Sequence, residues 1–236
     1  WAEVNDLNTG RYGLMMKAIQ TSAIAAGGWD GSRAAVTELW DGNTWTEVNN
    51  LNVGRSDTGG VGTSNTAALC VAGKNPSSNP PSGLLDLTES WNGTNWTEVG
   101  DLNSAGEQRA SIGTTTAALC FGGNTGSPTN NTELWNGSNW TEVNNLNLAR
   151  TQLNGAGTTT AGLAIGGSPS TASVEEWNGS NWSNVDSLNA ANAGLAAAGT
   201  AAAGLAMGGY TTTTVASTEE WDGTGLITKT ITTTTD

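Results

Sequence analysis

Short runs of apolar and small residues, separated by turns rich in Gly, Asn and Thr, follow one another along the whole chain. Between residues 108 and 143 such runs fall at 108–113, 116–121, 132–135 and 139–143. The first two runs are rich in Ala, Gly, Thr, Leu and Ile, which is typical of strands buried on both faces. The last two flank a short turn with an Asn-Gly pair, a strong signal for a β-hairpin. The pattern predicts four short antiparallel strands.

This unit recurs down the chain, and its clearest copy is WNGSNWTEV at residues 135–143. Paired tryptophans mark the copies, at Trp40 and Trp45, Trp91 and Trp96, Trp135 and Trp140, and Trp177 and Trp182. The repeats begin near residues 1, 45, 96, 140 and 182. A four-stranded unit of about 44 residues fits the blade of a β-propeller. The sequence therefore predicts an all-β fold, a five-bladed β-propeller of four-stranded antiparallel blades over residues 1–225, with a C-terminal strand or tail at 226–236.

The fifth tryptophan pair is incomplete, because Leu226 stands where the partner of Trp221 is expected. At the other end of the chain, residues 1–4 (WAEV) have the form of an outer strand with no partner in front of it. We therefore expect the N-terminal strand, with Trp1, to complete the last blade and close the ring. Residues 226–231 are rich in β-branched side chains and could compete for the same edge or continue beyond it.

The repeats also resemble a known family. Four of them carry a glycine pair, at 27–28, 122–123, 166–167 and 208–209. A Glu two residues before an aromatic residue then follows, and a Trp after a short turn, as in the kelch repeat. The pattern departs from kelch by Trp in place of the usual Tyr on the third strand and by Ala72-Gly73 in the second repeat. Thr-, Asn- and Gly-rich kelch-like repeats of this kind are also similar to those of virion and surface proteins from marine phage and metagenomic sequence.

Composition narrows the classes of partner. The formal net charge of −13 argues against nucleic acid, since phosphates are bound by clustered Lys and Arg. No apolar run approaches the roughly 20 residues of a membrane span, so we expect no membrane insertion. Cys70 and Cys120 occupy one repeat position where other repeats carry Ala, and we interpret them as small buried residues rather than a disulfide.

Catalytic motifs find little support in the sequence. Histidine is absent, which removes Ser-His-Asp and Cys-His arrangements, and neither a zinc cluster nor a phosphate-cradling loop is present. Paired carboxylates could in principle hydrolyse a glycoside, but no unique pair stands out from the repeats. The loop residues Asp6, Asp101 and Asp186 lack the closely spaced oxygen ligands of a calcium loop. We expect no enzymatic activity, no metal site and no cofactor.

A glutamate two residues before a tryptophan recurs in every repeat and shares a strand face with that ring. These glutamates are Glu38, Glu89, Glu133, Glu175 and Glu219. They could be ligands of five equivalent sites, but a buried carboxylate must be paired, and a structural role is favoured. Arg11, Arg55 and Arg150 recur at one offset as candidate partners, whereas Gly106 and Asn192 stand there in the other two repeats.

The recurrent tryptophans have two interpretations as well. Aromatic faces suit sugar rings and cations, so each pair could be a binding platform. Their strict repetition at hairpin positions instead favours packing between blades. The set comprises Trp1, Trp40, Trp45, Trp91, Trp96, Trp135, Trp140, Trp177, Trp182 and Trp221.

The connection between the second and third strands varies most from repeat to repeat, and all five prolines lie in these connections. Variable loops on a rigid scaffold are where binding usually resides. Trp29 lies outside the periodic pattern, and a large apolar residue in a loop indicates a contact surface. The candidate binding residues on this face are Trp29, Asp30, Arg33, Lys74, Asn75, Asn79, Asn124 and Tyr210.

These observations favour a noncatalytic binding or structural module of a virion or extracellular surface assembly. Its expected partners are proteins of a larger assembly or surface glycans, bound at the variable loops. One alternative is a multivalent carbohydrate-binding lectin with a site on each blade or between blades. Another is an intracellular kelch scaffold for protein interaction.

Overall fold

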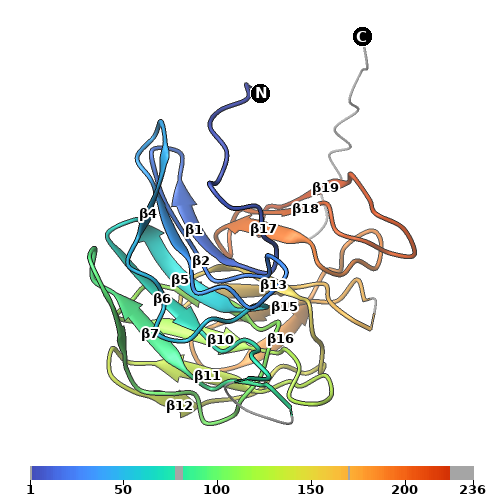
Figure 1. The fold of residues 1–236 in the computed structure, drawn as a ribbon. Helices are drawn as coiled ribbons and strands as arrows, with labels where there is room; N and C mark the ends of the chain where they lie inside the picture. The colour runs from blue at the N-terminus through green and yellow to red at the C-terminus, as the bar shows by residue number, and fades with distance from the viewer. Residues whose placement is uncertain (1, 78–81, 170, 224–236) are drawn as a thin grey trace.

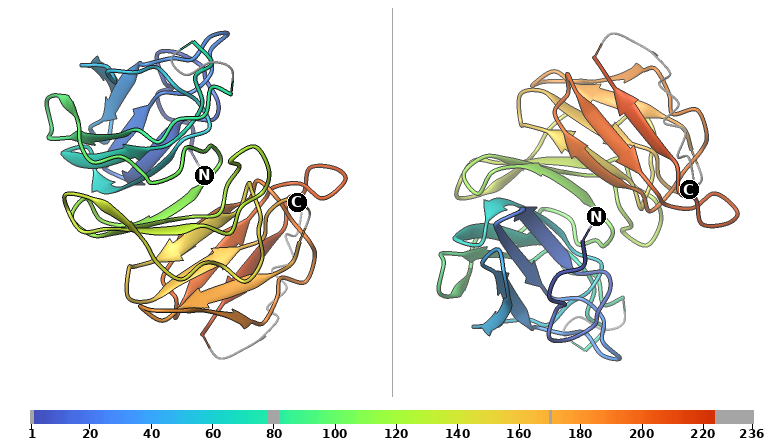
Figure 2. Two further views of the ribbon diagram at one scale, coloured as in Figure 1. Left: turned by 90° about the horizontal axis from the view of Figure 1, so that it is seen from below. Right: turned by 90° about the horizontal axis from the view of Figure 1, so that it is seen from above.

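The computed structural model describes residues 2–77, 82–169 and 171–223. Five antiparallel sheets lie around a common axis and form the expected five-bladed β-propeller, with no helix in the described residues (Figures 1 and 2). Strands pair in chain order within each blade, from the innermost strand outward. The connections that the sequence marks as variable therefore join the second and third strands of each blade on one face of the propeller, which we call the loop face.

The strands of the first three blades have the following bounds. Blade 1 contains β1 (Met15–Ile19), β2 (Ser22–Ala26), β3 (Thr37–Trp40) and β4 (Trp45–Val48). Blade 2 contains β5 (Gly59–Ser64), β6 (Ala67–Val71), β7 (Thr88–Trp91) and β8 (Trp96–Glu98). Blade 3 contains β9 (Ala110–Gly113), β10 (Ala118–Phe121), β11 (Thr132–Trp135) and β12 (Trp140–Glu142). The four predicted runs of the third repeat are thus confirmed as strands, of which β11 matches its run and the other three are somewhat shorter.

The last two blades differ in their outer edge. Blade 4 contains β13 (Asn154–Gly157), β14 (Gly162–Ile165), β15 (Val174–Trp177) and β16 (Trp182–Val185). Blade 5 contains β17 (Ala196–Gly199), β18 (Gly204–Met207) and β19 (Thr218–Trp221). Among the described residues, blade 5 has three strands and β19 is its edge.

Each Trp pair belongs to a hairpin between the third and fourth strands. In blade 2, Trp91 and Trp96 face each other directly, with ring centroids 5.4 Å apart. The turn is closed by Asn92, whose Oδ1 accepts the backbone N–H groups of Thr94 and Asn95 at 2.9 Å. Gly93 supplies the positive φ of 93° that the turn requires. The Asn-Gly signal is therefore explained by turn chemistry.

The blades pack with an aliphatic face of one blade against the tryptophan face of the next. Val61, Leu69 and Val71 of blade 2 pack in one cluster with Trp135 and Trp140 of blade 3. A hydrogen bond accompanies this packing in blades 2 to 4, where the outer Trp donates its indole N–H to a buried Thr hydroxyl of the preceding blade. The three pairs are Trp96 with Thr37 at 2.9 Å, Trp140 with Thr88 at 2.9 Å, and Trp182 with Thr132 at 3.1 Å.

Residues 2–4 do not form the expected closing strand. They belong to no strand and are exposed, with Val4 65% accessible, while Trp1 and the tail from 224 lie outside the described residues. One feature distinguishes this place from the other blades. Val174 stands where other blades carry Thr, so an outer Trp in blade 5 would find no hydroxyl acceptor. The residues that follow keep the repeat contacts, since the Asn8 backbone N–H donates to Glu38 Oε2 at 2.7 Å as that of Asn52 does to Glu89 Oε2.

Candidate functional site

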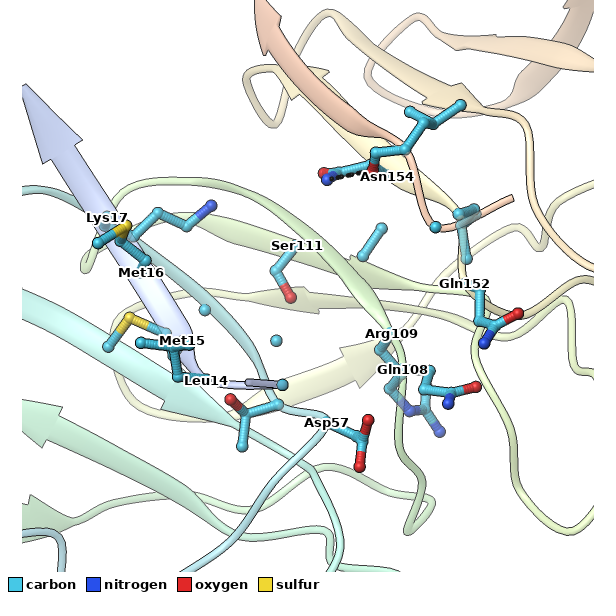
Figure 3. Close-up of a pocket in the computed structure, with 18 residues that line it drawn as sticks. Leu14, Met15, Met16, Lys17, Asp57, Gln108, Arg109, Ser111, Gln152 and Asn154 are labelled. Carbon is cyan, nitrogen blue, oxygen red and sulfur yellow. Dashed lines mark hydrogen bonds between the residues drawn. The ribbon is translucent and has the colours of Figure 1, made fainter. Parts of the chain in front are cut away.

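A pocket of about 430 Å³ lies on the propeller axis at the centre of the loop face (Figure 3). All five blades contribute to it, because it is lined by the innermost strands or by the links that lead into them. Its polar lining side chains are Lys17, Asp57, Thr58, Gln108, Arg109, Ser111, Gln152 and Asn154. The pocket size falls within the roughly 300 to 1,000 Å³ that is usual for small-molecule sites.

Five equivalent residues with left-handed backbone surround the mouth of this pocket. They are Gly13, Asp57, Gln108, Gln152 and Gly194, with φ between 54° and 63°. Backbone hydrogen bonds run from blade to blade along them, from Asp57 N–H to Gly13 O at 2.7 Å and from Gln108 N–H to Asp57 O at 2.8 Å. Gly194 N–H donates to Gln152 O at 2.9 Å in the same way. A non-glycine residue in this region costs on the order of 1 kcal/mol, so the belt fixes three side chains at the mouth under strain.

The two glutamines of this belt have their amide oxygens occupied. Gln108 Oε1 accepts a hydrogen bond from Thr151 Oγ1 at 2.8 Å, and Gln152 Oε1 accepts one from the Tyr210 hydroxyl. The amide NH₂ groups of both side chains therefore remain available as donors. Gln108 and Gln152 present hydrogen-bond donors at the pocket mouth.

Lys17 extends from β1 toward the middle of the pocket, on the side where Ser111 lies (Figure 3). Burial lowers the pKa of this ammonium group. Within the described residues, no carboxylate lies within ion-pair distance of it. The Ser111 hydroxyl is likewise buried with no hydrogen-bond partner. The pocket interior thus holds an unpaired cation and an unused hydroxyl.

A second set of equivalent residues forms the rim of the loop face around this pocket. Each rim residue directly follows the glycine pair, or its Ala72-Gly73 counterpart, and makes a single β-bridge to the link entering its own blade. The pairs are Trp29 with Tyr12, Lys74 with Ser56, Asn124 with Glu107, Ser168 with Thr151, and Tyr210 with Ala193. The structure shows that the sequence-based interpretation of Trp29 as lying outside the periodic pattern is wrong. Trp29 occupies a regular position whose side chain changes in every blade, and this variation hides the repeat.

The rim residues predicted from the sequence make the following contacts. The Arg33 guanidinium lies 4.3 Å from the centroid of the Trp29 ring, a cation–π distance. Lys74 Nζ lies 3.2 Å from Glu107 Oε1, and Asn124 Nδ2 donates to the same oxygen at 3.1 Å. The rim of blades 2 and 3 is thereby joined through one carboxylate.

The other predicted residues have local roles or lie farther from the axis. Asp30 Oδ1 accepts from the Ser32 backbone N–H and hydroxyl, both at 3.0 Å, and these bonds lower the pKa of Asp30. Asn75 closes a similar turn by accepting from Ser77 N–H at 2.9 Å. Asn79 lies outside the described residues. None of the seven predicted residues that the structure describes lines the axial pocket directly, although Tyr210 borders it through its bond to Gln152.

The repeated glutamates accept hydrogen bonds and ion pairs within the core in blades 1, 2 and 4. Buried pairs join Arg11 with Glu38 at 3.2 Å, Arg55 with Glu89, and Arg150 with Glu175 at 3.1 Å. The link from blade 1 into blade 2 adds further donors to the glutamate of blade 2, since Asn52 N–H and Nδ2 donate to Glu89 Oε2 at 2.7 and 2.8 Å. The glutamates are thus used within the fold, consistent with the structural interpretation.

Blade 3 has no arginine at the repeat position, and another arginine takes its place. Gly106 occupies the arginine position, and the Arg109 side chain fills the space above it, 2.7 Å from where a Cβ of residue 106 would lie. Arg109 Nη2 donates to the Ser104 hydroxyl at 2.7 Å, and this hydroxyl donates to Glu133 Oε1 at 3.3 Å. Ser104 thus relays Arg109 to the glutamate of its blade.

The recurrent tryptophans of blades 2 to 4 are buried in the interfaces between blades and present no open ring face. Cys70 and Cys120 are also buried, as free thiols, and burial raises the pKa of both. Across residues 2–77, 82–169 and 171–223, no helix is long and apolar enough to cross a membrane. No group of three or more His, Cys, Asp or Glu side chains within these ranges is placed to hold a metal ion.

Comparison with models of known protein families finds no match, and no curated protein matches the chain. A β-propeller fits a binding or scaffold module in general, and the fold alone names no ligand. The geometry of the site must therefore carry the functional argument.

Sequence reasoning did not single out Lys17, Asp57, Gln108 or Gln152. A signal for Asp57, Gln108 and Gln152 was present. Each stands two residues after the position that carries Arg in three repeats, and the residues at the same offset in the other two repeats are Gly13 and Gly194. Glycine at one repeat position indicates left-handed backbone there. Lys17 has a signal of its own, because every other blade has an aliphatic residue at its register position.

Proposed function

We propose that this chain is a noncatalytic binding module of a virion or extracellular surface assembly, and that its partner contacts the loop face. One observation carries the proposal. The rim holds five different side chains on five equivalent backbone positions, namely Trp29, Lys74, Asn124, Ser168 and Tyr210. A constant frame with a variable rim is the arrangement of a recognition surface.

The opposite face lacks this variety. There the hairpin turns repeat one solution, in which Asp41, Asn92, Asn136 or Asn178 accepts backbone N–H groups of its own turn. The kelch-like repeats and the Thr-, Asn- and Gly-rich composition support the proposed setting in a surface assembly. The net charge of −13 supports partners other than nucleic acid.

Exposed aromatic residues give one sector of the loop face its own character. Tyr12 is 66% exposed and Tyr210 is 38% exposed, and both are rim or rim-bridging residues of blades 1 and 5. Aromatic rings of this kind are enriched at protein contacts and also stack on sugar rings. A glycan at this sector is the second candidate function. It differs from a site on each blade, since the tryptophans that such sites would need are buried in blades 2 to 4.

Selection of binders on the whole chain tests the proposal. A displayed peptide library and a glycan array are screened with the wild-type protein and with Tyr12→Ser and Tyr210→Ser. The matched control is Ile19→Ser, because Ile19 is 56% exposed at the far end of β1, next to the opposite face. We expect binding to fall about tenfold or more in the rim variants and to stay within about twofold in the control.

The outcomes separate the candidates. Peptide binders that are lost with the rim variants support a protein partner, and glycans lost with the same variants favour the lectin alternative. Binders that depend on Ile19 and ignore both tyrosines contradict a recognition surface on the loop face. Catalytic turnover by the isolated chain would contradict the noncatalytic role.

A further inference from the structure

The axial pocket differs from the rim in the chemistry that it presents. Among its lining residues, the groups free to interact are mostly donors. They are the ammonium of Lys17, the amide NH₂ groups of Gln108 and Gln152, the hydroxyls of Thr58 and Ser111, and the Nε and Nη1 groups of Arg109. Asn154 is satisfied locally, since its Oδ1 accepts from Gly155 N–H at 2.8 Å and its Nδ2 donates to Leu195 O at 3.2 Å.

Lys17 breaks the repeat at the position where it stands. Its register partner is Ile24, and the equivalent residues of the other innermost strands are Val61, Ile112, Ala156 and Ala198. An aliphatic residue is therefore sufficient for the fold at this place. Lys17 is partly buried and has no partner among the described residues, so its ammonium group can accept a counter-ion in the pocket.

The described residues do not supply that counter-ion. The other charged groups that line the pocket are Asp57 and Arg109. Asp57 lies at the mouth, where its Oδ2 accepts from the Ser56 hydroxyl at 2.8 Å, and Arg109 is bonded to Ser104. A smaller void of about 140 Å³ also borders Lys17 and extends along the innermost strands toward Gly113 and Gly157. Space and donors are therefore both present around the ammonium group.

We propose that the axial pocket binds a small organic anion through its carboxylate, with Lys17 as the charged contact and the Gln108 and Gln152 amides and the Ser111 hydroxyl as hydrogen-bond donors. A carboxylate accepts several donors at once and is favoured by an ammonium partner in a partly dry site. A metal cation does not suit the same pocket, since Asp57 is the one carboxylate among its lining residues. The site goes beyond the proposed partner surface and does not depend on it.

Calorimetric titration of the full chain with sodium glucuronate and with sodium acetate tests the site, with glucose as the uncharged control. We expect glucuronate to bind and glucose not to bind. Lys17→Met keeps the length of the side chain and removes its charge, and should weaken glucuronate binding about tenfold or more. The matched control Lys74→Met removes a rim cation that is already paired with Glu107, and should leave binding within about twofold.

A second variant tests the site even if Lys17→Met fails to fold. Asp57→Asn removes the negative charge at the pocket mouth, and asparagine tolerates the left-handed φ of 55° at this position. Glucuronate should bind this variant several-fold more tightly. Binding should weaken as pH rises, and at a lower pH than for an exposed lysine, because burial lowers the pKa of Lys17.

Three results would overturn the proposal. They are the absence of heat for glucuronate and acetate with the wild type, unchanged binding in Lys17→Met, and equal binding of glucose. Loss of anion binding in the rim variant Tyr12→Ser, with binding unchanged in Lys17→Met, would assign the ligand to the rim instead. Peptide or glycan binding at the rim is read out separately, so the two proposals fail independently.

Discussion

The middle of the propeller and its last blade use the same strand sequence to different effect. In blade 3, the Thr-Glu-Leu-Trp strand β11 is buried at Thr132, Glu133 and Trp135, between blades 2 and 4. In blade 5, the Thr-Glu-Glu-Trp strand β19 leaves Thr218 exposed and Trp221 only partly buried. The difference shows that the motif alone does not make this strand a core element, and that the segments packed around it decide its burial.

The hydrogen bonds follow the same division. Thr88 and Thr132 accept the indole N–H of the next blade, whereas Thr218 accepts no indole N–H among the described residues. Glu219 accepts two bonds from Asn189 at 2.8 Å, and Asn192 stands in its blade where three others have arginine. Within the described residues, blade 5 thus has neither the accepted indole bond of blades 2 and 3 nor the Arg–Glu pair of blades 1, 2 and 4.

The largest expected contrast concerns the buried ion pair. Glu89→Gln leaves the Arg55 guanidinium buried without a counter-charge, and should lower the free energy of unfolding by about 3–5 kcal/mol. Glu219→Gln removes no ion pair, and should cost less than about 1 kcal/mol. Urea unfolding followed by tryptophan fluorescence measures both. Equal losses would show that blade 5 is as tightly integrated as blade 2.

Glycine substitutions give the next contrast. Gly122 and Gly208 both have left-handed backbone, with φ of 63° and 60°. A Cβ at Gly122 would lie 2.7 Å from Leu153 Cδ2 and 2.9 Å from Arg150 O, whereas at Gly208 the nearest atom is 3.7 Å away. Gly208→Ala should therefore cost only the backbone strain of about 1 kcal/mol, and Gly122→Ala about 1–3 kcal/mol more. Thermal unfolding of the two variants tests this order, and a larger loss for Gly208→Ala would contradict it.

The interblade indole bond predicts a smaller difference. Thr88→Val leaves the buried Trp140 N–H without an acceptor, and should cost about 1–3 kcal/mol. Thr218→Val changes an exposed side chain and should stay within about 0.5 kcal/mol. Denaturant midpoints of both variants are compared with the wild type. A loss at Thr218 equal to that at Thr88 would mean that an indole is bonded there in solution.

The smallest expected effect lies in a turn of blade 1. Asp41 accepts the backbone N–H groups of Asn43 and Thr44, both at 2.8 Å, and these bonds lower the pKa of Asp41. The turn is therefore supported above the ordinary pKa of aspartate and loses this support as pH falls through the lowered value. Amide NMR shifts of Asn43 and Thr44 should report that titration, while the Asn92 turn of blade 2 stays unchanged. Asp41→Asn should abolish it, and a titration that persists in this variant would refute the assignment.

The repeat pattern predicted the strands, the number of blades and the burial of Glu and Trp, because these follow from periodic residues within one blade. Features that depend on contacts between blades escaped it. In blade 3, Gly106 stands at the repeat position that carries Arg in blades 1, 2 and 4. Arg109, three residues farther along the chain, fills the space that this glycine leaves, and only the structure reveals it. The sequence pattern marked the variable loops but gave no indication of the axial pocket behind them.

At the rim positions, the side chains of the proposed contact surface vary while the main-chain bridges that hold the fold stay the same. Trp29 and Tyr210 occupy the same backbone geometry as Lys74, Asn124 and Ser168, and each is held by a main-chain bridge that is indifferent to the side chain. On the recognition surface that we propose, mutation at these five places can therefore change the ligand without a matching cost in folding. A lineage carrying this scaffold could follow a changing target by point substitutions alone, one blade at a time.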